Sequence, residues 1–487
     1  MGVLLAYLPF KEGYRSARWP STSKNKNLYF LYPPWFLAYS ASLLERENIE
    51  VDLVDAVAED MDDNQFIEYV KKKDPDLIVA EITTITSKKD LQLLKLIKNE
   101  VGCNIAVCGS HATALHEDIL KNNSHIDFVL LGEYELTILE LSKKLQLHKY
   151  EKIFGLAFRE KNKIKVNPRK PLIEILDSLP FPARHFLTME RYNEPFAEVP
   201  NQQMITSRGC PFRCVFCVWP QILYDHKVRF RSPKNIVDEM ELLVKEYKPK
   251  EIYFDDDSFT LSQQHILEIC KEIKERGLDI QWSCMGHANL SEDVLKKMKD
   301  AGCVGIKFGV ETASPEVMKK IKKALDLNKV KEFAKISKKL GFRTHATYMI
   351  GLPGDTKETI DKTLKFAVNL GTNSFQISIA TPFPGTEFYD MAKKNGWLVT
   401  DDFSRYDGNK EAVVSYPWLS KEEIDEEFKK ALSLTSRLDL GLIKYFMRYK
   451  YQTRGLGGIL SLPKEGFSYS RRLLRKKVFS LKAKYVR

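Results

Sequence analysis

Three closely spaced cysteines are the residues of this sequence best suited to chemistry. Cys210, Cys214 and Cys217 follow the spacing C-x3-C-x2-C. Three thiolates on one loop can hold three corners of an iron–sulfur cube and leave the fourth iron open to a ligand. The alternative is structural zinc, which requires four closed protein ligands, and no further C-x2-C or H-x3-H pair follows downstream. The spacing therefore predicts a [4Fe–4S] cluster.

Acidic residues and glycines occupy the ends of later predicted strands. The aspartates Asp255, Asp256 and Asp257 form an acidic strand end that suits an ammonium group, although Asp257 or Ser258 could instead cap the next helix.

Glu311 ends another predicted strand, and a buried glutamate needs a partner, either a ligand or a barrel Lys or Arg. Gly351 and Gly354 follow a third strand, where they permit close backbone approach or a simple turn. The sequence singles out no catalytic acid, base or nucleophile.

The first 148 residues alternate buried strands with amphipathic helices, which predicts a doubly wound α/β domain of the Rossmann or flavodoxin type. Ligands of such sheets bind at the carboxyl ends of the strands. The expected strands are residues 2–8, 50–54, 77–81, 105–108 and 127–131, and the expected helices are 38–47, 64–72, 88–100 and 137–145.

Residues 149–200 are rich in proline and are interpreted as a linker with one hairpin, 155–158 and 163–166. Residues 201–396 then resume the alternation as a partial (β/α)6 barrel of the TIM type. Residues 397–487 are predicted to be helical, with a basic tail. The expected barrel strands are 204–207, 252–254, 280–284, 304–308, 344–348 and 374–379, and the expected helices are 235–246, 264–276, 292–301 and 327–340.

The cysteine content of the chain indicates its cellular compartment, and its charge indicates the kind of partner. Eight cysteines in 487 residues are too sparse for a disulfide scaffold, which favours the reducing cytoplasm. Neither a membrane-spanning run nor a secretory leader is expected. The net charge of +11 is concentrated in the last 51 residues, which carry fourteen Lys and Arg against Asp439 and Glu465. Such a tail predicts an anionic partner.

The cysteine motif at a strand end, followed by a barrel pattern, resembles the radical S-adenosylmethionine (SAM) superfamily. The resemblance implies that the open iron chelates SAM, and that reduction by an external donor of the flavodoxin or ferredoxin type yields a 5′-deoxyadenosyl radical. It also implies that Asp255–Asp257 hold the methionine amino group, that Glu311 contacts SAM, and that Gly351 and Gly354 lie near the adenine.

The first domain resembles the cobalamin-binding domain of one branch of this superfamily. The resemblance implies corrin or nucleotide contacts at Asp55, Gly109, His111 and Gly132. His111 could equally be a hydrogen-bonded loop residue. The D-x-H-x-x-G pattern of a lower axial histidine has Val57 in place of the histidine. Cobalamin is therefore expected to bind without an axial histidine, and loss of the cofactor is the alternative.

The stretch after Cys217 resembles members associated with hopanoid and related lipid biosynthesis. The expected reaction modifies an unactivated carbon of a lipid or other small molecule, by methylation or by C–C bond formation or rearrangement. A methylthiotransferase for tRNA or protein is the rival enzyme, but it needs three further cluster cysteines, and the first domain has only Cys103 and Cys108. A cobalamin or iron sensor is the non-enzymatic rival.

The basic tail mixes aromatic residues with Lys and Arg, notably over residues 442–451 and 468–486. Such a segment can lie on an anionic membrane surface, here the inner face of the cytoplasmic membrane. Binding to RNA is less expected, and a solvated terminal helix is the remaining alternative.

Deleting residues 437–487 is therefore expected to abolish binding to anionic liposomes, measured by co-sedimentation, because it removes a net charge of +12. Unchanged sedimentation of the truncated protein would contradict the membrane hypothesis.

Overall fold

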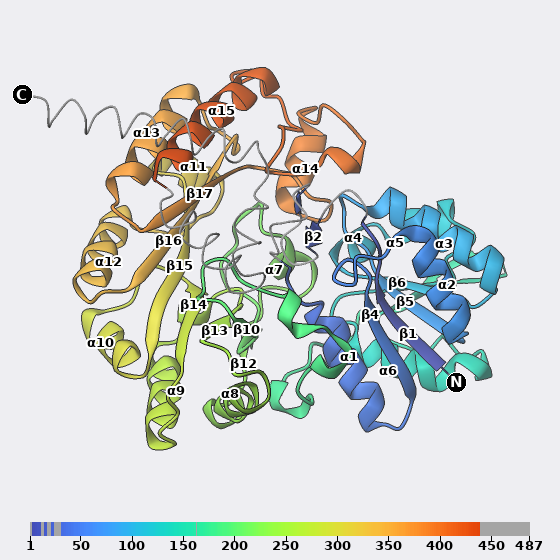
Figure 1. Cartoon of the computed structure of the whole chain (residues 1–487). Helices are drawn as coiled ribbons and strands as arrows, with labels where there is room; N and C mark the ends of the chain where they lie inside the picture. Colours follow the sequence, from blue (N-terminus) through green and yellow to red (C-terminus); the bar gives the residue numbers. More distant parts are fainter. Residues whose placement is uncertain (1, 11–13, 17–20, 24–30, 162, 439–487) are drawn as a thin grey trace, which may run out of the picture. The chain divides into compact units, whose positions relative to one another are not determined.

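The computed structural model describes residues 2–10, 14–16, 21–23, 31–161 and 163–438. Residues Met1–Ser433 form one compact unit, and the following description concerns this unit. The hypotheses on the basic tail concern residues 439–487, which lie outside the described residues. Two separate sheets, one mainly parallel and one wholly parallel, organise the two halves of the unit (Figure 1).

The first sheet has five parallel strands in an order typical of flavodoxin-like folds. In spatial order these are β4 (Glu50–Asp55), β1 (Gly2–Tyr7), β5 (Leu77–Glu81), β6 (Asn104–Cys108) and β7 (Phe128–Leu130). The predicted doubly wound domain is confirmed. The hairpin expected in the linker, β8 (Leu156–Glu160) and β9 (Lys163–Val166), extends this same sheet by antiparallel pairing with β7.

Helices cover both faces of the first sheet. Successive residues of its strands point to opposite faces, and the residues on both faces are apolar. Odd residues of β1 pack with α1 (Trp35–Arg46) and α6 (Glu135–Lys144), and even residues pack with α2 (Asp63–Lys73) and α3 (Ser87–Val101). A capping box at Asp62 begins α2, and Gly102, with φ of +78°, ends α3. Two short helices were not predicted: α4 (Ser110–Ala114) and α5 (His116–Asn122).

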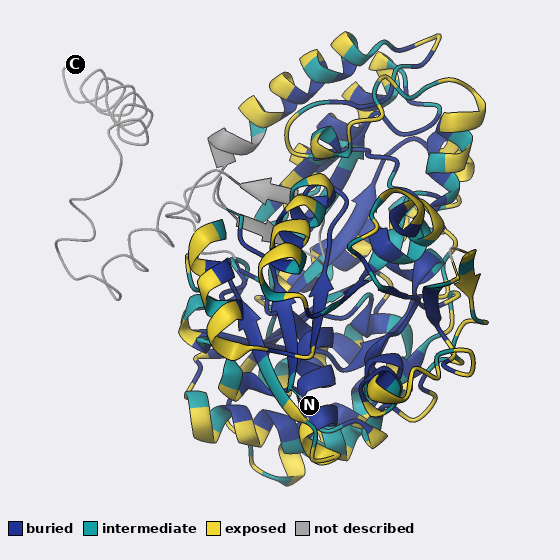
Figure 2. Ribbon diagram, turned by 90° about the vertical axis from the view of Figure 1, so that its right-hand side faces the viewer, coloured by how far each residue is buried: buried dark blue, intermediate teal, exposed yellow. Residues whose placement is uncertain are grey.

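The second sheet confirms the partial (β/α)6 barrel. Its six strands are all parallel and follow sequence order. They are β10 (Asn201–Met204), β13 (Glu251–Phe254), β14 (Gln281–Gly286), β15 (Cys303–Glu311), β16 (Arg343–Ile350) and β17 (Ser374–Ile379). The crossover helices include α8 (Pro233–Tyr247), α9 (Gln263–Glu275), α10 (Glu292–Asp300), α12 (Leu327–Lys339) and α13 (Lys357–Asn369). Figure 2 shows the buried strands inside helices whose outer faces are exposed.

The first barrel strand differs from the prediction of one strand at 204–207. The chain bends after β10 and forms a separate ribbon, in which β11 (Ser207–Arg208) pairs antiparallel with β12 (Arg229–Phe230). The three cysteines lie between these two strands. The ribbon therefore brackets the loop that carries them.

The region after Gly396 is less helical than predicted. Helix begins only at α15 (Lys421–Leu438), and residues 397–420 are irregular apart from one 3₁₀ turn and isolated bridges. A cluster of Trp397, Tyr416 and Trp418 explains this, because its ring contacts, with centroids 5.0–5.7 Å apart, hold the segment in loops. Among the described residues, no helix has the length and apolar character that a membrane span needs.

Candidate functional site

The loop that we name the cluster loop, residues 209–217, connects β11 to α7 (Val218–Ile222) and carries Cys210, Cys214 and Cys217. Gly209 begins it with φ of +91°, and a Cβ at this position would run into the backbone carbonyl of Lys227. Only glycine suits both constraints. The sequence analysis did not identify Gly209 as a site residue.

Two of the three predicted aspartates hold the backbone that leads into the cluster loop. Asp256 accepts hydrogen bonds from the amides and hydroxyls of both Thr206 and Ser207, with the amide of Thr206 at 2.6 Å. Asp257 accepts one from the amide of Gly209 at 2.8 Å. Burial raises the pKa of Asp256, and these hydrogen bonds oppose that rise.

The acidic strand end therefore has a structural role that the sequence did not suggest. Neither Asp257 nor Ser258 caps the following helix, since Ser262 caps α9 through the amide of His265. Asp255 is fully buried at the end of β13, directly before the two loop-holding aspartates. Binding of the methionine amino group by this strand end stays a prediction.

The second half of the cluster loop is held by Gln221. Its amide nitrogen lies 3.1 Å from the carbonyls of Cys214 and Val215 and 2.6 Å from that of Cys217. Its amide oxygen accepts a hydrogen bond of 2.9 Å from the backbone of Glu387, at the start of α14 (Glu387–Lys394). An amide has two donor hydrogens and can satisfy two of these carbonyls at a time. Gln221 thus fixes the loop carbonyls to α7 and α14.

The donor chemistry of the three thiols is compatible with an iron–sulfur cluster. Cys210 and Cys214 are buried and Cys217 is partly exposed, all as free thiols. Among the described residues, no group of three or more His, Cys, Asp or Glu side chains is arranged so that it could hold a single metal ion. A cube takes one thiolate at each of three irons, so its ligands need not converge on a point.

Burial raises the pKa of each thiol, that of Cys210 to about 11, while the nearby Lys323 opposes the rise for all three. Binding of a cluster by these thiols would therefore release their protons.

Glu311 is paired within the protein. It ends β15 at a bulge with φ of +68°, and its carboxylate lies 3.4 Å from Nζ of Lys323. Gly309 makes room for this conformation, because a Cβ there would meet the Glu311 carboxylate. Burial raises the pKa of Glu311, and Lys323 opposes the rise. Glu311 therefore has a lysine partner, although Lys323 follows α11 (Pro315–Lys320) and does not lie on a strand. A contact between Glu311 and SAM stays a prediction.

The glycines predicted near the adenine form a turn against protein side chains. Gly351 and Gly354 both have positive φ, +74° and +91°. A Cβ on Gly351 would lie 3.0 Å from Ile424 of α15, and one on Gly354 would run into Lys320. Turn geometry and packing explain both glycines, and a role in adenine binding stays a prediction.

At the first sheet, Asp55 shapes its own strand end. One carboxylate oxygen accepts from the amides of Val57 and Ala58 at 3.0 and 3.1 Å, and the other accepts from the Tyr192 hydroxyl at 2.9 Å. Val57 is buried where an axial histidine would stand. The donor set at this position therefore fits cobalamin only without a protein nitrogen on the metal.

Gly109 and Gly132 lie at the carboxyl ends of β6 and β7, with φ of +102° and +72°. Thr113 joins them, since its hydroxyl donates to the carbonyl of Gly109 at 2.9 Å and accepts from the amide of Gly132 at 3.1 Å. The buried His111 lies 3.3 Å from the Thr84 hydroxyl and against the ring of Phe403. Burial lowers its pKa to about 4, so it is neutral near pH 7.

The structure thus gathers the predicted residues at two strand-end edges, one on each sheet. Sequence reasoning missed four residues that hold these edges, because their side-chain contacts depend on how irregular loops fold and no periodic pattern marks them. These are Thr113, Gly209, Gln221 and Lys323.

Two family models match the chain, the Radical SAM superfamily over residues 204–367 and the B12 binding domain over residues 25–142. An uncharacterized methyltransferase of Pyrococcus horikoshii is 35% identical over 403 residues, 82% of this chain and 86% of the relative. The cytidylyl-2-hydroxyethylphosphonate methyltransferase of Streptomyces wedmorensis is 28% identical over 81% of this chain and 84% of its own. The hopanoid C-3 methylase of Methylococcus capsulatus is 24% identical over 80% and 74%.

Among solved structures, the radical SAM methyltransferase TsrM from Kitasatospora setae, with cobalamin and a [4Fe–4S] cluster bound, superposes with a TM-score of 0.68. The match covers 90% of this chain and 88% of TsrM at 17% identity. At this identity the likeness concerns the fold.

Gln221→Glu is expected to speed cluster loss to a chelator about tenfold, because the loss of two hydrogen bonds costs about 1–3 kcal/mol. Iron release is followed by absorbance after anaerobic reconstitution. Gln264→Glu, at an exposed glutamine of α9, is the matched control. Equal release rates in the two variants would show that Gln221 does not hold the loop.

Asp256→Asn is expected to lower the free energy of unfolding of the cluster-free protein by about 1–3 kcal/mol, because an amide nitrogen would face the donors of Thr206 and Ser207. Denaturant titration measures this change. Asp279→Asn, at an exposed position, is expected to change it by less than about 0.5 kcal/mol.

Proposed function

The chain belongs to the cobalamin-binding radical SAM methyltransferases, and we propose that it methylates an unactivated carbon of a lipid or another small organic molecule. The cofactors of the family are a [4Fe–4S] cluster, SAM and cobalamin. When bound, the cluster supplies the electron that cleaves SAM, and the cobalamin carries the methyl group. The cysteines of the cluster loop are the ligands that we assign to the cluster.

The observation that carries this proposal is the contact between the two strand-end edges. Helix α4, which follows Gly109, packs against α7, which follows the cluster loop. Gly385, which precedes α14, lies against both helices. A Cβ at this position would lie 2.8 Å from Ala114 of α4 and 3.0 Å from Ile222 of α7. A methyl group moving between a corrin and a substrate beside SAM needs these two edges to be neighbours.

A lipid substrate is our working hypothesis. Two observations support it. The stretch after Cys217 resembles members associated with hopanoid and related lipid biosynthesis, and a hopanoid C-3 methylase is among the relatives. The basic tail would complement it by holding the enzyme at an anionic membrane surface. Membrane association and an external low-potential electron donor both belong to this proposal.

A polar substrate is the second candidate, favoured by side chains in the middle of the barrel sheet. Strand register places Met285, Lys307, His345 and Ser374 in one row across β14 to β17. Lys307 lies 3.4 Å from Glu194, and Nδ1 of His345 lies 2.8 Å from the hydroxyl of Ser374. Lys307 and His345 are only partly buried, and such groups suit a polar molecule better than a hydrocarbon.

The proposal predicts transfer of a deuterated methyl group from SAM to carbon under anaerobic, dithionite-reduced conditions. The reconstituted enzyme with cobalamin is offered a lipid extract and a polar small-molecule extract in parallel, and mass spectrometry follows the label. Label in the lipid arm supports the working hypothesis, and label in the polar arm supports the second candidate. Cys210→Ala is expected to abolish the label and the release of 5′-deoxyadenosine.

SAM cleavage without carbon-bound label in either arm would contradict methylation of these substrate classes. Absence of cleavage by the reconstituted wild type would contradict the proposed function as a whole.

A further inference from the structure

A buried network of four charged side chains connects the two cofactor edges. Arg208 of β11 lies 3.1 Å from Glu133 and 2.7 Å from Glu135, and Arg229 of β12 lies 2.7 Å from Glu133. The two arginines are register partners in the ribbon that brackets the cluster loop. The two glutamates follow β7 in the first sheet. All four side chains are at most 4% exposed.

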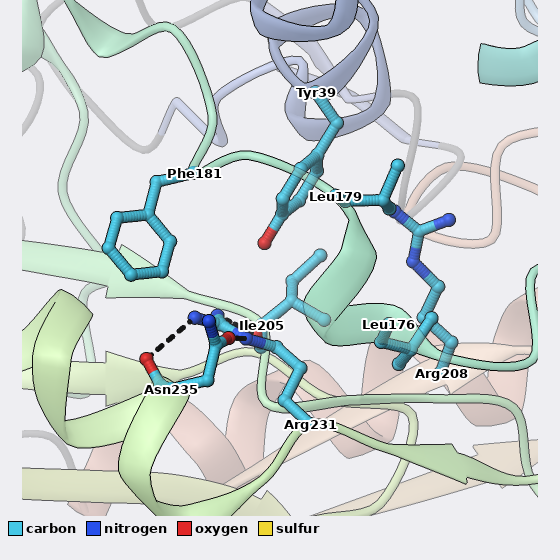
Figure 3. A pocket seen from close by; sticks show the side chains of 8 residues that line it. All are labelled: Tyr39, Leu176, Leu179, Phe181, Ile205, Arg208, Arg231 and Asn235. Carbon is cyan, nitrogen blue, oxygen red and sulfur yellow. Dashed lines mark hydrogen bonds between the residues drawn. The ribbon is translucent and has the colours of Figure 1, made fainter.

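The network is charge-balanced and closely packed. Two arginines face two carboxylates, so every member compensates another away from water. The guanidinium of Arg208 also stacks on Phe36 and Tyr39 of α1, at 4.7 and 5.2 Å from the ring centroids. Figure 3 shows Tyr39 and Arg208 at a cavity beside the network. That cavity has a volume of about 10 Å³, room for about one water molecule.

Each end of the network touches a loop assigned to a cofactor. Arg208 is separated from Cys210 only by Gly209, whose amide donates to Asp257 and whose backbone lies close against the carbonyl of Lys227. Glu133 is the neighbour of Gly132, which Thr113 joins to Gly109. A shift of either loop would therefore move one charge of the network away from its partner.

We propose that Arg208 is a positioning residue that couples the cobalamin edge to the cluster loop, so that filling one site tightens the other. The inference rests on the proposed function only in taking cobalamin as the ligand of the first sheet. Because coupling between two sites is reciprocal, its size can be read from cobalamin binding alone, without turnover.

A second buried network offers a matched control. Arg231 pairs with Glu239 and stacks on Phe181 at 5.4 Å, and its side chain is only 5% exposed. Its other partners are Asn235 of α8 and the carbonyl of Ile205, which precedes β11, and Phe181 belongs to the connector, residues 149–200; none of its ion-pair partners lies in the first sheet. Arg231→Lys therefore perturbs a buried arginine of the same kind, beside the same cavity, without removing an ion pair to the first sheet.

The experiment measures the dissociation constant of hydroxocobalamin for the full chain, with and without a reconstituted cluster. For the wild type and for Arg231→Lys, the cluster is expected to tighten binding about tenfold. For Arg208→Lys and Glu135→Gln the two constants should become equal, because the link between the loops is weakened. Should a single variant fail to fold, the charge-balanced pair Arg208→Met with Glu135→Gln replaces it, with the same expected result.

Equal constants in the wild type, or a tenfold difference retained by Arg208→Lys and Glu135→Gln, would overturn the coupling and leave the proposed function standing. No cobalamin binding by the wild type would overturn both. Methyl transfer is not part of the readout, so failure of catalysis and failure of coupling are separate results.

Discussion

The buried ion pairs between Arg208, Arg229, Glu133 and Glu135 are the interaction on which the arrangement of the two sheets depends. Charges removed from water are tolerated only when partners are in place, and removing one partner of such a pair typically costs about 3–5 kcal/mol. The first sheet and the ribbon at the barrel mouth each supply two of the four charges. Neither half can bury its share of the network alone, so the strand-end edges are held face to face.

The cluster loop obeys a related constraint. A loop that must offer three thiolates to a cluster cannot form regular backbone hydrogen bonds, so its polar groups need other partners. Asp256 satisfies the amides of Thr206 and Ser207 before it, Asp257 satisfies the amide of Gly209 at its start, and Gln221 satisfies carbonyls within it. The acidic strand end that suggested an ammonium site thus also shapes the loop. Lys323 adds a buried positive charge between Glu311 and the thiols.

Local patterns in the sequence were sufficient for most of the fold, and the assignment of the three cysteines as cluster ligands stays a prediction. Apolar periodicity located every strand of both sheets to within a few residues, because most of these strands are buried on at least one face and their apolar residues mark them in the sequence. The short helices α4 and α5 carry too few residues for a periodic signal. Arg208 and Glu133 are 75 residues apart, and no local pattern pairs residues at such a separation. The glycines were recognised as special, yet their neighbours, such as Ile424 beside Gly351, depend on tertiary packing.

The hairpin β8–β9 changes how the connector between the two domains is understood. It covers the β7 edge of the first sheet, and its outer strand presents Lys163 and Lys165 to solvent, charges that discourage pairing with another chain. Further along, the connector supplies Tyr192 to Asp55 and Arg184 to Glu239 of the barrel. The connector therefore packs against both domains. A chimera that takes its first domain from a relative would therefore have to take the connector as well, because its contacts with Asp55 and Glu239 would otherwise be mismatched.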